Sequence, residues 1–357
     1  MALGLRVAVA LSGGVDSSVA AALLQDQGHE VVGITLQQWP RGDSESALRH
    51  GGCCSLSAVE DARRVAGVLG IPYFVWNLER EFGERVIEPF HRGYREGRTP
   101  NPCLRCNSFV RFDLMLNRVL DLGFEALATG HYARILGAGD AIELHSGLDP
   151  QKDQSYMLYH LDQARLAHIV FPLGALTKPR VREIAAEHRL PVATKAESME
   201  ICFVPLGQTR QYLARQVGSG VGAVVDGDGN LLGQHRGTSL YTVGQRGGFG
   251  SLIEPGPWYV LSIDAPANRL VVGRREELDR TTVRLDDMSW IAGSEPTSAL
   301  ACEARLRYHA TPIVARYWRG ELELSQPFAG PAPGQAAVLY QDTRVLGGGI
   351  ITASPPA

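Results

Sequence analysis

The sequence has 357 residues but lacks any run of about 18 apolar residues, the length that a membrane-spanning helix requires. The opening "MALGLRVAVALSGG" reaches a polar turn too early for a secretory signal, so we expect no such leader. Six cysteines are too few and too scattered for the disulfide framework of a secreted protein. Internal repeats and low-complexity segments are missing as well. These absences favour a globular protein of a reducing cytoplasm that employs a few thiols chemically.

An excess of charge of either sign is also missing. The chain carries 35 Lys and Arg against 38 Asp and Glu, a formal net charge of −3. A nucleic-acid partner would therefore be met by a local basic face rather than by the overall charge. With 45% hydrophobic residues the composition is ordinary for a globular protein, and the length suggests two or three domains.

The first part of the chain alternates between two kinds of segment. Strand-like stretches occupy 6–11, 29–37, 72–78 and 124–135. Helix-like stretches occupy 17–28, 57–71, 108–123 and part of 176–195. This rhythm predicts an α/β fold with a doubly wound parallel sheet, in which ligands bind at the carboxyl ends of the strands.

The composition and the pattern of predicted secondary structure change after about residue 208. Residues 218–237 are rich in glycine, and "DGDGN" within them is typical of a hairpin. Short alternating stretches follow from about residue 278, which is typical of an antiparallel barrel or sandwich. We predict three domains: 1–208 with the parallel sheet, 209–277 as a small β-rich domain and 278–357 as an antiparallel β-barrel.

A glycine-serine turn, "SGGVDSS" at 12–18, joins the first strand to the first helix. Backbone N–H groups at such a turn and the helix N-terminus together form an anion cradle. The plainer alternative is a turn in which Ser12 or Asp16 merely caps the helix. The Walker pattern GxxxxGK[ST] is absent, so the turn is not a phosphate cradle of that type.

The turn resembles the pyrophosphate loop of the PP-loop ATP pyrophosphatases, a superfamily with a HUP-like fold. Along nearly its whole length the chain further resembles the tRNA-specific 2-thiouridylases. The stretches that carry this resemblance are "SGGVDSS" (12–18), "GRTPNPCLRCN" (97–107), "ATGHYAR" (128–134), "GLDPQKDQSYMLY" (147–159), "LTKPRVREIA" (176–185), "ICF" (201–203), "TVGQRGGFG" (242–250), "PWYV" (257–260), "RLRYHATP" (305–312) and "LGGGII" (346–351).

The resemblance implies ATP-dependent 2-thiolation of the wobble uridine of tRNA. The uridine O2 would attack the α-phosphate, pyrophosphate would leave, and a persulfide sulfur would then displace AMP from C2. Asp16 would help to bind Mg²⁺, a cation that prefers carboxylate and phosphate oxygens. The ATP-binding residues implied are Ala10, Leu11, Ser12, Gly13, Gly14, Val15, Asp16, Ser17, Leu36 and Gly130.

Two cysteines carry the sulfur chemistry in this resemblance. Cys202 aligns with the persulfide carrier, and Cys106 aligns with the nucleophile that forms a transient disulfide with it. From the residues alone, each cysteine could be a small buried hydrophobe. For Cys106, the neighbouring Arg105 and the proline-containing loop favour a reactive thiol over a buried core residue. For Cys202, the residues alone leave both interpretations open, and the reactive role is what the resemblance implies. Cys53 and Cys54 are interpreted as residues at a helix entry, and Cys302 as a core residue of a barrel strand.

Cys103 departs from the pattern, because many family members have an aspartate at this place. With Cys106 it forms a C-x-x-C motif, and Cys202 would complete a set of three thiolates. Such a set suits a [4Fe–4S] cluster that carries sulfide, and it also suits zinc or a redox disulfide. The persulfide route is our first hypothesis, and the cluster route is the second.

The resemblance also implies contacts with the anticodon stem-loop of tRNA. The wobble base would leave its stack to reach ATP. In the absence of the resemblance, a solvated polar turn is the default interpretation of 152–154. The residues implied are Asn101, Pro102 and Cys103 for the target base, Lys152, Asp153, Gln154, Arg307 and Tyr308 for tRNA binding, and His131 and Gln335 for tRNA selectivity.

Two other functions stay open at this point. One is another PP-loop synthetase acting on a small metabolite, and the other is a non-enzymatic RNA-binding or iron–sulfur scaffold. A thiouridylase further requires a sulfur donor, either a relay protein or a cysteine desulfurase system. We expect a cytoplasmic location and no membrane partner.

Overall fold

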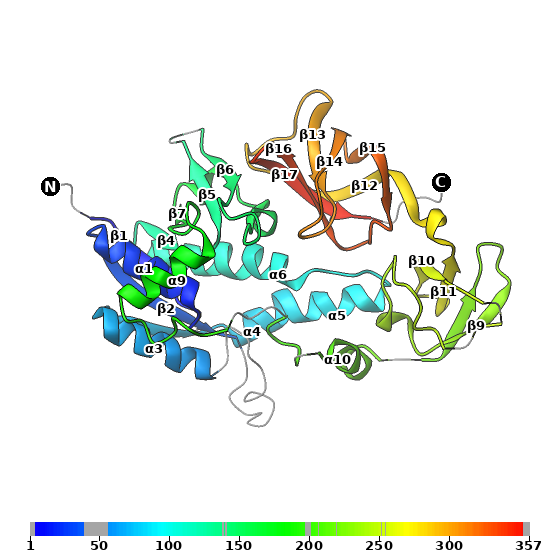
Figure 1. Cartoon of the computed structure of the whole chain (residues 1–357), viewed down its shortest axis with the longest axis horizontal. Helices are drawn as coiled ribbons and strands as arrows, with labels where there is room; N and C mark the ends of the chain where they lie inside the picture. The colour runs from blue at the N-terminus through cyan, green and yellow to red at the C-terminus, as the bar shows by residue number, and fades with distance from the viewer. Residues whose placement is uncertain are drawn as a thin grey trace.

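A computed structural model describes residues 4–38, 56–137, 139, 141–196, 201–205, 207–218, 220–250, 252–253 and 255–352. Cys53 and Cys54 lie outside these residues. No helix within the described residues is long and apolar enough to cross a membrane. The chain forms an elongated molecule in which the N-terminal domain, the C-terminal barrel and a β-rich domain surround the central helices α5 and α6 (Figure 1).

A parallel sheet organises the N-terminal domain, with the strand order β3-β2-β1-β4-β7. Its strands contain runs of buried apolar residues, as expected for a sheet covered by helices. They are β1 (Arg6–Ala10), β2 (Glu30–Gln37), β3 (Tyr73–Asn77), β4 (Ala126–Ala128) and β7 (Ile169–Val170). The prediction of a doubly wound parallel sheet is confirmed.

Helices pack around this sheet and continue toward the other domains (Figure 1). The segment from α6 through α7 is one continuous helical stretch with a π-helical middle, so the helix expected at 108–123 begins earlier, at Pro102. The helical elements are α1 (Val15–Asp26), α3 (Leu56–Leu69), α4 (Glu79–Phe82), η1 (Gly83–Ile87), α5 (Glu88–Arg95), α6 (Pro102–Arg105), η2 (Cys106–Met115), α7 (Leu116–Asp121), η3 (Ser155–Leu158), α8 (Gln163–Leu166), α9 (Lys178–Glu187) and α10 (Thr209–Gln216).

The C-terminal strands form an antiparallel barrel, which β12 closes by pairing with both β15 and β17. Its strands are β12 (Asp279–Trp290), β13 (Leu300–Arg305), β14 (Ile313–Trp318), β15 (Glu321–Ala329), β16 (Ala336–Gln341) and β17 (Arg344–Ile351). The smaller β-rich domain contains β8 (Gly222–Val225), β9 (Leu231–His235), η4 (Thr238–Leu240), β10 (Tyr259–Asp264), β11 (Arg269–Gly273) and η5 (Arg275–Leu278). The hairpin expected at "DGDGN" joins β8 to β9.

One expectation is wrong. Residues 124–135 are not one strand, because the chain leaves the parallel sheet after Ala128 and crosses Gly130 before forming β5 (Ala133–Leu136). β5 pairs with β6 (Glu143–Ser146), and β6 pairs with β17. A hairpin of the N-terminal domain thus extends the sheet of the barrel. The largest hydrophobic cluster likewise contains buried residues of both domains, among them Phe112 and Val338.

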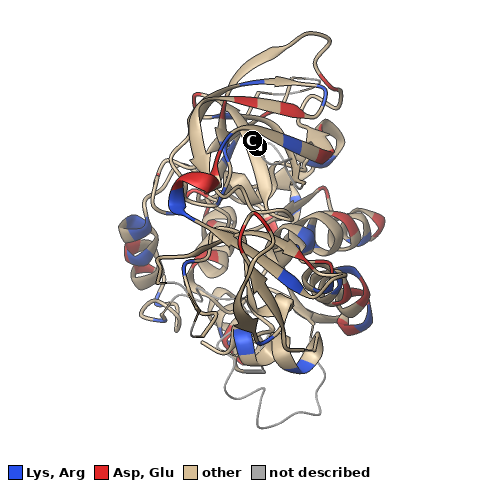
Figure 2. Ribbon diagram, turned by 90° about the vertical axis from the view of Figure 1, so that its right-hand side faces the viewer, with Lys and Arg blue, Asp and Glu red and all other residues tan. Residues whose placement is uncertain are grey.

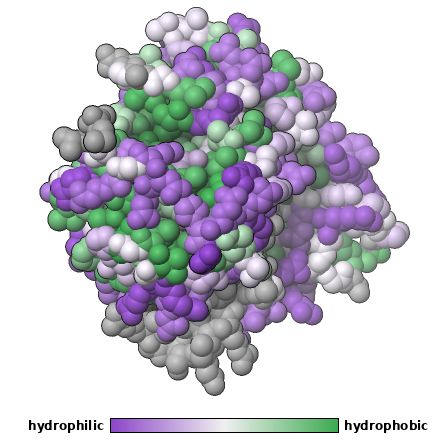
Figure 3. All heavy atoms as spheres, turned by 60° about the vertical axis from the view of Figure 1, so that its left-hand side comes forward, coloured by the Kyte–Doolittle hydropathy of each residue, from purple (hydrophilic) through white to green (hydrophobic). Residues whose placement is uncertain are grey.

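Charged residues of both signs are interspersed on the side that Figure 2 shows. Over the end that carries the N-terminal domain, apolar patches alternate with hydrophilic ones (Figure 3). On this side of the molecule the two signs of charge are mixed rather than gathered into separate patches.

Candidate active site

The turn 12–14 lies at the carboxyl end of β1 and leads into α1. Gly13 has a φ of +67°, and a Cβ on it would lie 2.1 Å from the Ala58 carbonyl oxygen, so only glycine fits there. Gly14 is the N-cap residue, and no side chain caps the helix in the described structure. The alternative of a mere capping turn is therefore wrong. The N-terminal amides of α1 are left for another acceptor, as in an anion site.

Other residues expected to bind ATP lie at the same edge of the sheet. β2 and β4 both flank β1, so the ends of these strands are adjacent to the turn. Leu36 is buried near the end of β2. Gly130 follows β4, and a Cβ there would lie 2.6 Å from the backbone nitrogen of Ser17. The fold thus brings 10–17, Leu36 and Gly130 together, although their contacts with ATP stay predictions.

The carboxylate of Asp16 is held by two residues that the sequence analysis did not select. Lys178 Nζ, at the start of α9, lies 2.7 Å and 2.8 Å from the two carboxylate oxygens. The Tyr132 hydroxyl donates a hydrogen bond of 2.7 Å to Asp16 Oδ1. A second lysine, Lys195, donates to the carbonyl oxygen of Gly13 at 2.8 Å. In this arrangement Asp16 would have to release Lys178 before binding Mg²⁺ through the same oxygens.

The cysteine-bearing helix reaches the same edge of the sheet through Cys106. The Gln38 amide, just after β2, lies 3.9 Å from Cys106 Sγ, a contact at the outer limit for sulfur. Cys106 is half-buried and packs against the largest hydrophobic cluster. Cys103 is exposed one turn earlier on α6. The expected nucleophile is therefore positioned close to the end of a strand that borders the phosphate loop.

Cys202 packs against the same hydrophobic cluster as Cys106 and is also half-buried. It neighbours Tyr212 on α10, whose pKa is raised to about 12 by burial and further by the charge of the Cys202 thiolate. The following residue, Phe203, packs edge-on against Phe90 of α5. Cys302 is buried in the barrel, as expected, and burial raises the pKa of its thiol to about 11.

The three thiols expected for an iron–sulfur cluster do not form a metal site. Among the described residues, no group of three or more His, Cys, Asp or Glu side chains is arranged to hold a metal ion. Cys103, Cys106 and Cys202 therefore do not fit a cluster in this conformation.

The structure brings the expected tRNA-binding segments of two domains together. The Tyr308 hydroxyl donates a hydrogen bond of 3.3 Å to the carbonyl oxygen of Asp153, and the Tyr308 ring packs against Tyr156. Arg307 donates to the carbonyl oxygens of Ala329 and Gly330. Burial raises the pKa of Tyr308, the charge of Asp153 adds to this effect, and the charge of the Cys103 thiolate makes a smaller contribution, so Cys103 lies near this junction.

Several of these residues already have structural partners. Asp153 is 5% exposed, and its carboxylate accepts hydrogen bonds from Gly147, Ser155 and Arg305. The side chain of Gln154 accepts a hydrogen bond from the Tyr132 amide. Lys152, beside them, is only partly exposed. In this conformation Asp153 secures the loop to the barrel rather than presenting its carboxylate to a base.

The other residues expected to contact tRNA, Asn101, Pro102 and Gln335, lie in or against the loop 97–107. Asn101 Oδ1 caps α6 by accepting from the amides of Cys103 and Leu104, and Pro102 follows as a buried first residue of that helix. The Gln335 side chain donates to the Thr99 carbonyl oxygen, which ties the barrel to this loop. The loop that carries the cysteines is therefore fixed from both sides.

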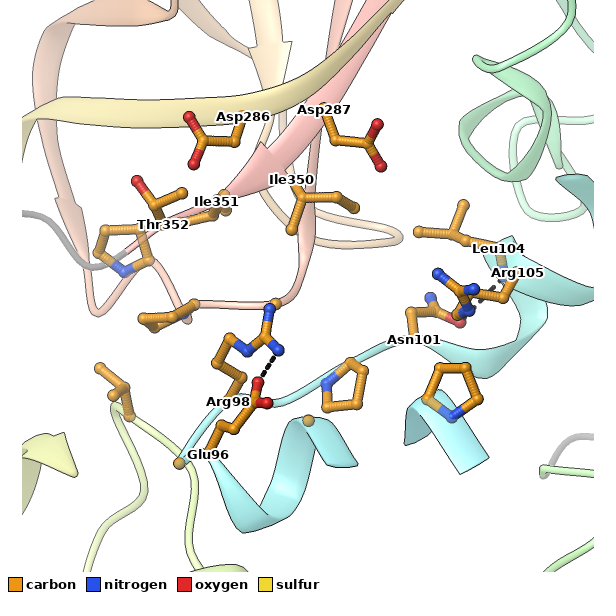
Figure 4. A pocket seen from close by; sticks show the side chains of 18 of the residues that line it. Glu96, Arg98, Asn101, Leu104, Arg105, Asp286, Asp287, Ile350, Ile351 and Thr352 are labelled. Carbon is orange, nitrogen blue, oxygen red and sulfur yellow. Dashed lines mark hydrogen bonds and ion pairs between the residues drawn. The ribbon is translucent and has the colours of Figure 1, made fainter. Parts of the chain in front are cut away.

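A cavity of about 860 Å³ lies behind the cysteine-bearing helix, between the N-terminal domain, the central domain and the barrel. Leu104 and Arg105 point into it from α6, and Asp286 and Asp287 face it from β12 (Figure 4). Arg98 forms an ion pair with Glu96 at its floor (Figure 4). Since Cys103 and Cys106 do not line it, the cavity belongs to the reverse face of the helix.

His131 and His160 pack against the ring of Phe112, close to the carboxyl edge of the sheet. Burial lowers the pKa of His131 well below its usual value, and the charge of Arg111 adds to this effect. Burial likewise lowers the pKa of His160 to about 3. Both imidazoles are therefore neutral at pH 7. His131 Nδ1 forms a hydrogen bond of 2.7 Å with the Thr129 hydroxyl.

Acid should destabilise the fold through His160. An unfolded histidine has a pKa of about 6.5, so the unfolded chain binds a proton below that pH while the buried imidazole does not. The free energy of unfolding should then fall by about 1.4 kcal/mol per pH unit for this residue between roughly pH 6 and pH 4. Urea unfolding at several pH values measures this slope. His160→Leu should make the slope shallower by the contribution of one bound proton, about 1.4 kcal/mol per pH unit. An unchanged slope in that variant would show that His160 is not buried in the neutral form.

Comparison with known proteins agrees with this layout. The family model described as the tRNA methyl transferase HUP domain matches residues 5–206, the tRNA methyl transferase PRC-barrel domain matches 210–274, and the aminomethyltransferase beta-barrel domain matches 280–351.

Curated relatives match over nearly the whole chain. The tRNA-specific 2-thiouridylase MnmA of Geobacter metallireducens is 46% identical over 98% of this chain and 97% of its own length. The enzyme of the same name from Chloroflexus aggregans is 47% identical over 97% of this chain and 98% of its own length. Among solved structures, a 4-thiouridine synthetase–RNA complex with bound ATP is 20% identical over 60% of this chain and 50% of its own, with a TM-score of only 0.35. The relatives that match at full length decide the assignment: the chain belongs to the tRNA-specific 2-thiouridylase family.

Proposed function

We propose that this enzyme thiolates C2 of the wobble uridine of tRNA by an adenylation and persulfide route. The observation that carries the proposal is the meeting of the phosphate loop and the cysteine-bearing helix at one sheet edge, where Gln38 at the end of β2 contacts Cys106. A cytoplasmic location would supply both ATP and tRNA.

In the first step, the uridine O2 attacks the α-phosphorus of ATP and pyrophosphate leaves. The helix N-terminus at Gly14 and the loop amides favour the anionic leaving group electrostatically. Adenylation is needed because a carbonyl-type oxygen is a poor leaving group until it carries AMP. Mg²⁺ would supply further charge neutralisation to the phosphates, with Asp16 as the residue that would hold it.

In the second step, the terminal sulfur of a Cys202 persulfide forms a bond to C2, and AMP leaves with the oxygen. The Cys106 thiolate then attacks Cys202 Sγ and cleaves the S–S bond, so that 2-thiouridine departs and a Cys106–Cys202 disulfide remains. A cellular thiol reductant regenerates both thiols, and a relay protein or a cysteine desulfurase system reloads Cys202. The half-buried setting of both cysteines supports this proposal because it limits loss of the sulfur to solvent.

A single assay tests the function against its alternatives. The protein is incubated with ATP, a sulfur donor and tRNA that carries a wobble uridine, and the digested nucleosides are analysed by mass spectrometry. We expect 2-thiouridine at that position, with one AMP and one pyrophosphate per modified base. Turnover that requires a free amino acid instead of tRNA would favour a small-metabolite synthetase, and an absence of ATP turnover would favour a scaffold.

A further inference from the structure

The phosphate loop is contacted by two lysines from segments that lie far along the chain. Lys178, the first residue of α9, has a side chain that is only 9% exposed and an ammonium group within 2.8 Å of both Asp16 oxygens. Lys195 Nζ lies 2.8 Å from the Gly13 carbonyl oxygen and 2.6 Å from Asp61 Oδ2. Each ammonium is thus held beside the loop by a carboxylate.

The position of these lysines is unfavourable for stability alone. The N-terminus of α1 carries positive potential, and cations are stabilising at the opposite end of a helix. A buried lysine–carboxylate pair also gives little net stability, because removing both charges from water costs about as much as their attraction returns. An anion that binds between the two lysines and the helix would explain why two cations lie at the N-terminus of α1.

The surroundings of the loop leave one side open for such an anion. At Gly13 and Gly130 a Cβ would collide with backbone atoms, whereas at Gly14 it would meet only Ser12 Oγ, at 3.4 Å. The open side is therefore at Gly14, where α1 begins. Asp16 and Asp61 keep the two ammonium groups in place at the borders of this opening.

We propose that Lys178 and Lys195 form a diphosphate subsite that holds the β- and γ-phosphoryl groups of ATP and then the departing pyrophosphate. This inference rests on the proposed function, since it assigns residues to its first step. When the diphosphate binds, each ammonium group contacts phosphate oxygens, either in place of its carboxylate partner or in addition to it. The bond from the α-phosphorus to the bridging oxygen breaks while these charges stabilise the leaving group.

The test compares the binding of pyrophosphate, ATP and AMP to the full chain by calorimetry. Lys195→Met and Lys178→Met should each weaken pyrophosphate and ATP binding by at least about tenfold, as expected for the loss of one charge-assisted contact. AMP binding should stay within about twofold. Lys195→Arg should restore most of the pyrophosphate affinity. Arg180→Met, on the exposed face of the same helix α9, is the matched control and should change none of these affinities.

Two results would overturn the inference: unchanged pyrophosphate affinity in both methionine variants, or a parallel loss of AMP and pyrophosphate affinity in Lys195→Met. The second would indicate that Lys195 only supports the fold of the loop. These outcomes are distinct from a failure of the proposed function, in which the wild type would bind pyrophosphate through both lysines yet produce no 2-thiouridine.

Discussion

Replacing Cys202 with serine should abolish 2-thiouridine formation while pyrophosphate release continues. Serine fits the half-buried place of the cysteine beside Tyr212, but its oxygen cannot carry a transferable sulfur. We expect thiolation to fall by at least about 10³-fold, as is usual when an essential nucleophile is removed. Pyrophosphate release should persist because the phosphate loop lies on other segments. The two quantities are measured in one reaction, by nucleoside mass spectrometry and a coupled pyrophosphate assay.

Cys302→Ala is the matched control for this experiment. Its thiol is buried in the barrel, and its raised pKa keeps it protonated, so sulfur transfer should stay close to that of the wild type. Simultaneous loss of pyrophosphate release in Cys202→Ser would contradict the role given to Cys202. Iron and acid-labile sulfide are determined on wild-type protein purified anaerobically. Thiolation by iron-free protein is expected, and strict dependence on iron would favour the cluster route instead.

Replacing Asp153 with alanine should destabilise the protein by about 3 kcal/mol. The carboxylate is buried and lies 2.8 Å from Arg305 Nη1, so its removal leaves a largely buried guanidinium without its counter-charge. It also removes the acceptor for the amides of Gly147 and Ser155. Urea unfolding at constant pH measures the loss, which is a large part of the usual stability of a domain.

A double-mutant cycle separates this structural role from a contact with tRNA. Arg305→Met combined with Asp153→Ala should cost less than the sum of the two single changes, because the second change removes the stranded charge. If Asp153→Ala weakened tRNA binding without lowering the free energy of unfolding, the carboxylate would be a direct tRNA contact. The expectation from the sequence would then be right and the structural interpretation wrong.

The strands of the N-terminal domain were predictable where apolar runs end in clear turns. β1 runs into a glycine turn, and the run "VVGITL" forms the buried strand β2. The prediction of one strand at 124–135 was wrong. Apolar residues continue across Gly130, although the chain passes there from the parallel sheet to the sheet of the barrel. Local pattern does not report which sheet a strand joins, since that depends on the packing of Gly130 against α1.

The site was predictable only in part, for a related reason. The glycine and hydroxyl residues of 12–18 have a recognisable pattern at a strand end, whereas Leu36 and Gly130 were selected only through the resemblance to the 2-thiouridylases. Lys178 and Lys195 were missed, since ion pairs over more than 100 residues of sequence are a product of tertiary structure. One signal was available: a lysine directly before a proline at the start of a helix stands where cations are disfavoured. The burial of Asp153 had no comparable signal.

The pairing of β6 with β17 affects whether the N-terminal domain and the barrel can be separated or exchanged. A catalytic module that ends near residue 206 would keep β5 and β6 but lose their neighbour, leaving a bare strand edge that invites aggregation. A barrel taken alone would lose the outer hairpin that covers β17. The N-terminal domain and the C-terminal barrel therefore cannot be exchanged independently among chimeras, and they are expected to evolve as one cooperative unit.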